Sequence, residues 1–143
     1  MRRFARIFLS VLPFVYMVFI WILSSLPADA VIRFSFYDRI IKESLHLIEF
    51  AILYGLFAVA LAANGKLTKK GNLIAAAISA LYGAIDEIHQ SFVPYRSADI
   101  FDFVKDITGI LILYVLTVRG YFTPEKRGIG RLYGFLEKYA APR

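Results

Sequence analysis

The chain has 143 residues, of which 59% are hydrophobic and 20% are charged. Soluble domains contain about 45–50% apolar residues, so this composition excludes a disordered chain, a coiled coil and an ordinary cytosolic enzyme. The net charge is +6. Cysteine is absent, and this absence excludes disulfides, zinc knuckles and cysteine nucleophiles. A basic chain can bind nucleic acid, but the hydrophobic content instead predicts a small integral membrane protein with no nucleic-acid partner.

The first predicted membrane span covers residues 7–26, within a stretch of 22 residues that carries no charge. A helix needs about 20 apolar residues to cross a bilayer core about 30 Å thick. The arginines before this stretch and the sequence Ala28-Asp29-Ala30 after it also resemble a signal peptide with its cleavage site. Because the apolar stretch is longer than a typical signal-peptide core, we predict a membrane helix.

Three further spans are predicted over residues 45–64, 73–92 and 100–118. Each of them reaches a full crossing only by including ionisable residues at one end. A short buried helix of a soluble protein is the alternative for each, but the chain has no soluble counterpart that would bury them. The predicted fold is therefore all-α, a polytopic bundle of four transmembrane helices within a domain covering residues 1–120.

The distribution of basic residues predicts how this domain is oriented. Twelve of the 17 Lys and Arg residues lie before the first span, between the second and third, or after the fourth. Such residues concentrate on the cytoplasmic side, so both termini are predicted to be cytoplasmic and the protein to lie in the cell membrane. The basic tail, residues 121–143, has apolar residues at helical spacing, which indicates an amphipathic helix at the membrane interface. A tail that only fixes the topology fits the same residues.

Ionisable residues of the last three spans fall at similar depths. Counted at about 1.5 Å per residue from the predicted cytoplasmic ends, Glu49, Asp86 and Asp106 all lie about 20 Å above the inner boundary. Charged groups within a span normally face the bundle interior or a water-filled cavity. We therefore predict a polar pocket facing the extracytoplasmic side. Four more polar residues lie one turn higher on the same helices: His46, His89, Gln90 and Asp102.

Spacing along each span places these residues on shared helix faces. Gly109 lies one turn beyond Asp106 in the fourth span and is predicted to allow two helices to approach closely. Glu87 and Lys105 lie off the shared faces, where a structural role fits either residue, and Asp99 fits the N-cap of the fourth helix. The three groups are Lys42, His46 and Glu49; Asp86, His89 and Gln90; and Asp99, Asp102 and Asp106.

The run YGAIDEIHQSFVPYR over residues 82–96, followed by Asp102 and Gly109, resembles the signature of VanZ-like membrane proteins. Residues 42–50 (KESLHLIEF) are similar to that family's second-helix motif, and residues 21–27 (WILSSLP) to the end of its first helix. The chain differs at Tyr95, where the family commonly has glycine, and at Asp106, where it commonly has asparagine. The similarity covers about residues 14–116. It implies a multispanning membrane protein, and the name-giving member of the family confers resistance to the glycopeptide teicoplanin.

The polar pocket suggests general acid–base chemistry, because a histidine oriented by a carboxylate can transfer protons. Arg96 and Lys42 can hold a phosphate or carboxylate head group. Hydrolysis of, or group transfer to, an envelope lipid or lipid-linked precursor is one interpretation, and the sequence does not decide whether the protein is an enzyme. The predicted catalytic residues are His46, Glu49, Asp86, His89, Gln90, Asp102 and Asp106, and the predicted substrate-binding residues are Lys42, Arg96 and Glu87.

Three alternatives remain open from the residues alone. The pocket fits a non-enzymatic accessory protein that binds a lipid or an antibiotic precursor. Proton- or cation-coupled transport is less favoured, because the inner halves of these spans carry no polar path. A divalent metal ion is a further possibility, since a carboxylate and an imidazole one turn apart occur in the metal sites of helix bundles; the same pairs also fit ordinary hydrogen bonds. The ligands would be His46, Glu49, Asp86 and His89.

Overall fold

The computed structural model of the chain describes residues 2–26, 37–94, 96 and 99–142, with side chains in the second helix described from His46 onward. The described residues form helices and connecting segments without a strand, in agreement with the all-α prediction. Five helices follow one another along the chain: α1 (Arg2–Ser24), α2 (Tyr37–Ala63), α3 (Lys69–Gln90), α4 (Ile100–Tyr121) and α5 (Ile129–Ala140).

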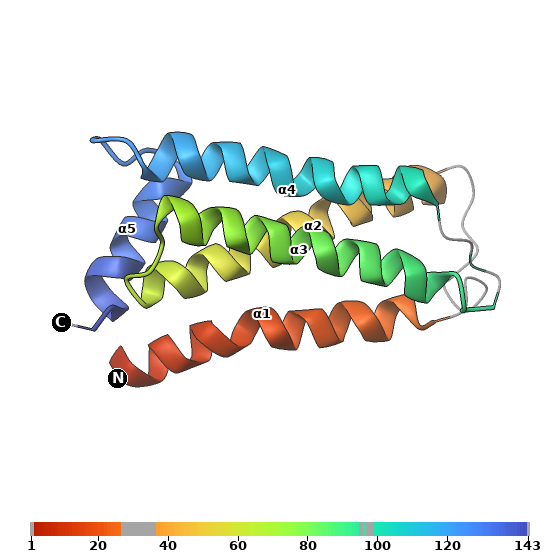
Figure 1. Ribbon diagram of the computed structural model, residues 1–143, viewed down its shortest axis with the longest axis horizontal. Helices are drawn as coiled ribbons and strands as arrows, with labels where there is room; N and C mark the ends of the chain where they lie inside the picture. Colours follow the sequence, from red (N-terminus) through yellow and green to blue (C-terminus); the bar gives the residue numbers. More distant parts are fainter. Residues whose placement is uncertain (1, 27–36, 95, 97–98, 143) are drawn as a thin grey trace.

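Four long helices run side by side along the molecule, and the short α5 lies across one end (Figure 1). Both termini are at this end, which we call the α5 end. At the opposite end, here called the far end, α1 and α3 finish and α4 begins. Helix α2 packs most extensively against α4 and also contacts α1, α3 and α5, so it is the central helix of the bundle.

Two helices of the described chain are long and apolar enough to cross a membrane, over Arg2–Ser24 in α1 and His46–Ala63 in α2. Helix α2 itself begins at Tyr37, eight residues before the span predicted from residue 45. Helices α3 and α4 have 22 residues each, which corresponds to about 33 Å and would also reach across a bilayer core. Their mixture of apolar and ionisable residues sets them apart from α1.

Side-chain caps determine where α3 and α4 begin. The hydroxyl of Thr68 accepts a hydrogen bond from the Gly71 amide at 3.0 Å. The carboxylate of Asp99 accepts one from the Phe101 amide at 2.9 Å. Both bonds satisfy amide donors that a helix start leaves free, and the predicted N-cap role of Asp99 is confirmed.

Apolar side chains cover the outside of the bundle as well as its core. Phe50, Leu53 and Tyr54 of α2 are fully buried, whereas Leu81 of α3 is 63% exposed and Phe101 of α4 is 68% exposed. Three carboxylates are buried inside the bundle: Asp86, Glu87 and Asp106. This distribution is the reverse of that in soluble proteins, in which acidic residues are almost never buried without a partner.

Glycines allow the closest helix contacts. A Cβ added to Gly109 of α4 would lie 1.9 Å from the carbonyl oxygen of Leu47 in α2, so the backbones of these helices meet there. The prediction that Gly109 allows close helix approach is confirmed. A Cβ added to Gly130 of α5 would lie 2.0 Å from the Gly120 oxygen at the end of α4. Any side chain at either glycine would push two backbones apart.

Helix α5 lies within the tail, where a helix was predicted. Tyr133, which is 1% exposed, and Ala140, which is 3% exposed, pack against the bundle. Leu132, Phe135 and Tyr139 remain exposed on its other side. The tail therefore closes the α5 end of the bundle with one face and presents a second apolar face outward.

Candidate functional site

Charged side chains from α2, α3 and α4 meet inside the bundle toward its far end. The Nδ1 atom of His46 is 3.4 Å from Oδ1 of Asp106, the distance of an ion pair when the imidazole is protonated. Glu87 of α3 places a carboxylate oxygen within 4.8 Å of ligand atoms of both residues. Asp106 is fully buried and Glu87 is 7% exposed. We call His46, Glu87 and Asp106 the central cluster.

The central cluster leaves several polar atoms without a hydrogen-bond partner. In the described part of the chain these are His46 Nδ1, Glu87 Oε1 and both carboxylate oxygens of Asp106. The second oxygen of Glu87 accepts a hydrogen bond from the Asp99 amide at 3.2 Å. A buried charge without such bonds is unfavourable by several kcal/mol. The buried charges of the central cluster therefore lower the stability of the fold.

Two glycines shape the space around Asp106. A Cβ at Gly83 of α3 would lie 3.3 Å from Oδ2 of Asp106 and 3.4 Å from the ring of Phe50. Gly109 follows Asp106 by three residues on the same helix, and its contact with α2 lies next to His46, at Leu47. Because neither glycine has a side chain, α2, α3 and α4 pack closely around the carboxylate of Asp106.

A second group links α3 to α1. The hydroxyl of Ser24 donates a short hydrogen bond to Oδ1 of Asp86. The amide of Gln90, one turn along α3, donates to Oδ2 of the same carboxylate at 2.7 Å. Asp86 is 2% exposed. Because both its oxygens accept hydrogen bonds, this carboxylate is a well-satisfied contact between two helices.

A third group lies at the end of α1. The Trp21 and His89 rings stack with centroids 3.8 Å apart, and Ser25 Oγ lies 2.9 Å from His89 Nε2. The guanidinium of Arg96 donates to the carbonyl oxygens of Leu26, at 3.0 Å, and of Leu23, at 3.3 Å. Arg96 therefore caps the end of α1, where the Leu23 carbonyl also accepts a hydrogen bond from the Leu26 amide.

Three other predicted site residues lie outside these groups. Asp102 pairs with Lys105 at 2.7 Å, one turn along α4. Glu49 is partly exposed, within electrostatic range of His46 and Asp86, and has no hydrogen bond or ion pair to any described residue. The side chain of Lys42 lies outside the described residues.

The structure thus divides the predicted site among three groups. His46 and Asp106 meet as expected, but they are joined by Glu87, which the spacing had placed off the shared face. The four predicted metal ligands do not converge: among the described residues, the ligand-bearing group contains His46 but not Glu49, Asp86 or His89. The contacts of Trp21, Ser24 and Ser25 with α3 were not predicted from the sequence. The two serines at the end of an apolar span could have indicated such contacts, because a polar side chain there needs a partner.

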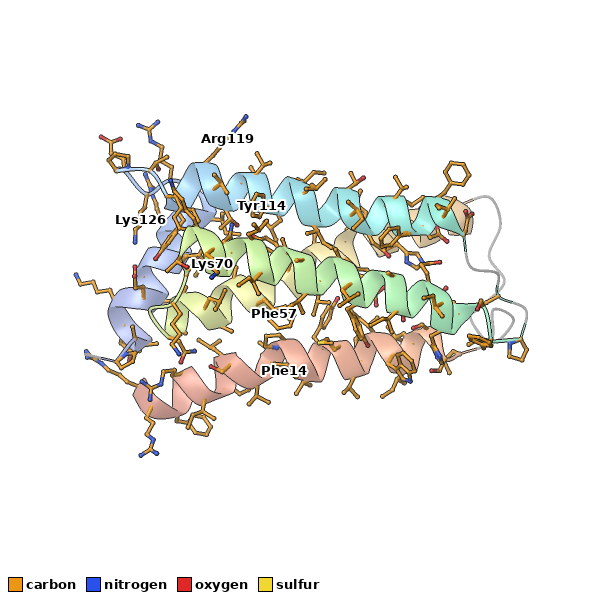
Figure 2. All side chains as sticks on the ribbon, in the orientation of Figure 1. Phe14, Phe57, Lys70, Tyr114, Arg119 and Lys126 are labelled. Atoms are coloured by element: carbon orange, nitrogen blue, oxygen red, sulfur yellow. The ribbon has the colours of Figure 1, made fainter. Side chains whose placement is uncertain are left out.

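An apolar groove opens on the side of the bundle between α1 and α3. At one end of it, Trp21 also stacks on His89. Near the middle of the molecule, the labelled Phe14 packs edge-to-face on Phe57, with ring centroids 5.8 Å apart (Figure 2). The groove is lined by Phe14, Met17, Val18, Trp21 and Tyr82.

The described residues define an all-helical protein in which two helices are long and apolar enough to cross a membrane and a charged cluster lies between helices. The chain belongs to the VanZ family, since the VanZ/LLP1 family model matches residues 3–121. Neither the curated proteins nor the solved structures contain a match to it. The matched region runs from the second residue of α1 to the last residue of α4, includes all the polar groups above, and ends before α5 begins at Ile129.

Proposed function

We propose that this VanZ-family protein crosses the membrane four times, with both termini cytoplasmic. We further propose that its far end holds an extracytoplasmic pocket that binds or acts on an envelope lipid or lipid-linked precursor. Domain 1–120 would carry the pocket and residues 121–143 would lie at the inner membrane surface.

The topology is supported by the outer surface of α3 and α4. Exposed apolar side chains occur along most of each helix, from Leu73 to Ile88 in α3 and from Phe101 to Leu116 in α4. Large apolar surfaces of this kind mark contact with lipid or protein. The labelled basic residues Lys70, Arg119 and Lys126 all lie at the α5 end (Figure 2), as expected if that end is cytoplasmic.

A lipid ligand is supported by the groove beside the polar groups. The groove between α1 and α3 is apolar and faces the surface that would contact lipid. An acyl chain would fit along Phe14 and Val18, with its head group beside Trp21 and His89. Arg96 has N–H donors beyond the two that bind α1 carbonyls, and these would meet a phosphate or carboxylate. Lys42 is the second proposed head-group residue.

The central cluster is the observation that carries the proposal of chemistry. Ionisable groups buried without partners are unfavourable for folding, so their presence indicates a function. His46 would act as the general base or acid, and Asp106 would orient its ring. Glu49, partly exposed and unpaired among the described residues, is the candidate for the second proton-transfer group.

Purified protein in nanodiscs tests this proposal. Envelope lipids and lipid-linked precursors from a bacterial extract would be added, and turnover followed by mass spectrometry. We expect a head-group cleavage or transfer product with wild-type protein and at least a hundredfold less with His46→Gln, by the usual size of a general acid–base contribution. Tyr54→Phe, at the α5 end, is the control and should retain turnover. Equal turnover by His46→Gln and wild type would contradict the catalytic proposal.

A non-enzymatic accessory role is the second candidate. It is favoured by the carboxylate of Asp86, which accepts a hydrogen bond on each oxygen and is therefore not free to take part in proton transfer. Saturable lipid binding without any product would support this role. Reduced teicoplanin susceptibility in cells that produce the protein, abolished by His46→Gln, would connect such binding to the cell envelope.

A further inference from the structure

The central cluster contains a set of groups that typically bind metal ions. An imidazole from α2 and carboxylates from α3 and α4 each offer a ligand atom, and these atoms lie within 4.8 Å of one another. Imidazole favours zinc, iron, copper and nickel, and carboxylates also accept manganese. Metal sites in helix bundles are built in this way, from inward-facing side chains of neighbouring helices.

The ligand atoms are buried and have no other partner. Asp106 is 0% exposed and neither of its oxygens accepts a hydrogen bond from a described residue. The same holds for Oε1 of Glu87, in a side chain that is 93% buried, and for Nδ1 of His46. An ordinary structural carboxylate in this bundle looks different, because Asp86 has a donor on each oxygen.

The charges also favour a cation. Glu87 and Asp106 carry two negative charges when ionised, and His46 can offset only one of them. Among the described residues, the other cations nearby are engaged elsewhere: Lys105 pairs with Asp102, and Arg96 donates to α1 carbonyls. A divalent ion with neutral His46 would bring the cluster to zero net charge, which is the favourable state for a buried site.

The distances suit an ion after small side-chain rotations. In a tetrahedral site, two ligand atoms that each lie about 2.1 Å from the ion are about 3.4 Å apart. His46 Nδ1 and Asp106 Oδ1 already satisfy this at 3.4 Å. The other ligand atoms lie within 4.8 Å of one another and need to approach by up to about 1.4 Å, which rotation of the Glu87 side chain can provide, since its Oε1 has no hydrogen bond to a described residue.

We propose that His46, Glu87 and Asp106 bind one divalent transition-metal ion, with Zn²⁺ as the first candidate. Three protein ligands leave a coordination position for water or a ligand group, as in catalytic rather than structural zinc sites. These three ligands differ from the four predicted from the sequence, and the two sets share only His46. It does not rest on the proposed lipid function, because the ligands are defined by the cluster itself.

Metal analysis of purified protein tests the site. Detergent-purified protein would be stripped with a chelator, exposed to excess Zn²⁺ or Co²⁺ and freed of unbound ion by gel filtration. We expect about one ion per wild-type chain, a visible d–d absorption that saturates at one equivalent of Co²⁺, and at least a tenfold lower occupancy in Asp106→Asn and His46→Gln. Glu125→Gln is the control, because it removes a carboxylate at the α5 end whose pair with Arg127 is largely exposed, and it should bind like wild type.

A second measurement on wild-type protein covers the case in which a variant fails to fold. Because an ion that binds only the folded state stabilises it, Zn²⁺ should raise the melting temperature of stripped wild-type and Glu125→Gln protein. Occupancy below a tenth of an ion per wild-type chain for both metals would overturn the proposal, as would equal losses in Glu125→Gln and Asp106→Asn. Lipid turnover by fully stripped protein would leave the lipid function standing without the metal site, so the two proposals fail separately.

Discussion

The two ends of the bundle both bury polar side chains, but they do so in opposite ways. Near the α5 end the buried polar groups are neutral: the Tyr54 hydroxyl donates to Asn72 at 2.6 Å, and the Thr117 hydroxyl donates to the Leu113 carbonyl at 2.8 Å. Toward the far end, the central cluster buries ionisable groups with free carboxylate oxygens. The α5 end still leaves the Asn72 amide nitrogen and the Tyr133 hydroxyl unpaired, although neither is charged.

The difference suggests two kinds of buried polar group: those that stabilise the fold and those that serve a function. A neutral hydrogen-bonded pair contributes about 1 kcal/mol to stability, whereas an uncompensated buried charge is unfavourable. The α5 end is therefore expected to respond to mutation through stability. The far end is expected to respond through binding and chemistry.

The largest expected effect comes from Gly109→Ala, because the new Cβ would lie 1.9 Å from the Leu47 carbonyl oxygen. Separating α2 from α4 at this point should lower stability by about 3 kcal/mol, as in other overpacked cores, and displace His46 from Asp106. Thermal unfolding in detergent measures the first effect, and lipid or metal binding the second. Gly55→Ala is the control, since its Cβ would meet only the side-chain methyl of Leu113, at 3.1 Å. Equal losses in the two variants would contradict the importance of this backbone contact.

Gly130→Ala should act on the α5 end alone. Its Cβ would lie 2.0 Å from the Gly120 oxygen, so α5 should detach at a cost of about 2 kcal/mol. Trypsin cleavage at Arg131 should then become at least tenfold faster, while binding at the far end is unchanged. Gly134→Ala is the matched control within α5, because its Cβ would meet the flexible side chain of Lys126. Loss of far-end binding in Gly130→Ala would show that the two ends are not independent.

Removing one polar group from each end should give effects of opposite kind. Tyr54→Phe leaves the buried Asn72 oxygen unpaired and should lower stability by about 1–2 kcal/mol. Asp106→Asn removes a buried charge and should leave the stability of chelator-treated protein equal or higher. Chemical unfolding of both variants under identical conditions measures this contrast. A comparable destabilisation in both would mean that Asp106 is a structural group.

The smallest expected effect concerns pH at the α5 end. Burial raises the pKa of Glu137, but hydrogen bonds from Lys126 and Tyr121 outweigh it, so the pKa lies below the 4.5 of a free side chain. A lowered pKa contributes stability that is present above that free value and is lost as pH falls through the folded value. The pair is more than a third exposed, so the contribution should be below about 1 kcal/mol.

Unfolding of wild type and Glu137→Gln between pH 7 and pH 3 checks this expectation. The wild type should be the more stable of the two above about pH 5, and the difference should vanish toward pH 3. Glu125→Gln provides the comparison, because its pair with Arg127 is largely exposed. A pH-independent difference for Glu137→Gln would contradict the assignment.

The sequence predicted the helices well because hydropathy and capping act locally. Apolar stretches led to four long helices, Asp99 was expected at a helix start, and Gly109 was expected at a close contact. The start of α2 was missed by eight residues, since Tyr37 to Ser44 are not apolar enough to be read as a membrane span. Hydropathy detects the part of a helix that suits lipid, whereas the backbone continues beyond it.

The site was only partly predictable, because helix spacing does not reveal which neighbours flank each face. Asp86 and Glu87 are consecutive and therefore point about 100° apart around α3. Asp86 meets Ser24 of α1, while Glu87 meets His46 and Asp106 of α2 and α4. Depth grouped Asp86 with Asp106, and the helix-face spacing left Glu87 aside. Which of Asp86 and Glu87 faces Asp106 depends on the order in which the other helices are arranged around α3.

The stacking of Trp21 on His89 has a practical consequence. The chain contains a single tryptophan, and its ring lies face to face with an imidazole at 3.8 Å. A protonated imidazole quenches indole fluorescence, so the emission of the unmodified protein reports on this one contact at the end of the groove. Trp21 also lines the groove between α1 and α3, in which the proposed lipid would lie. The protein therefore carries its own optical reporter of occupancy, and binding can be followed without a label.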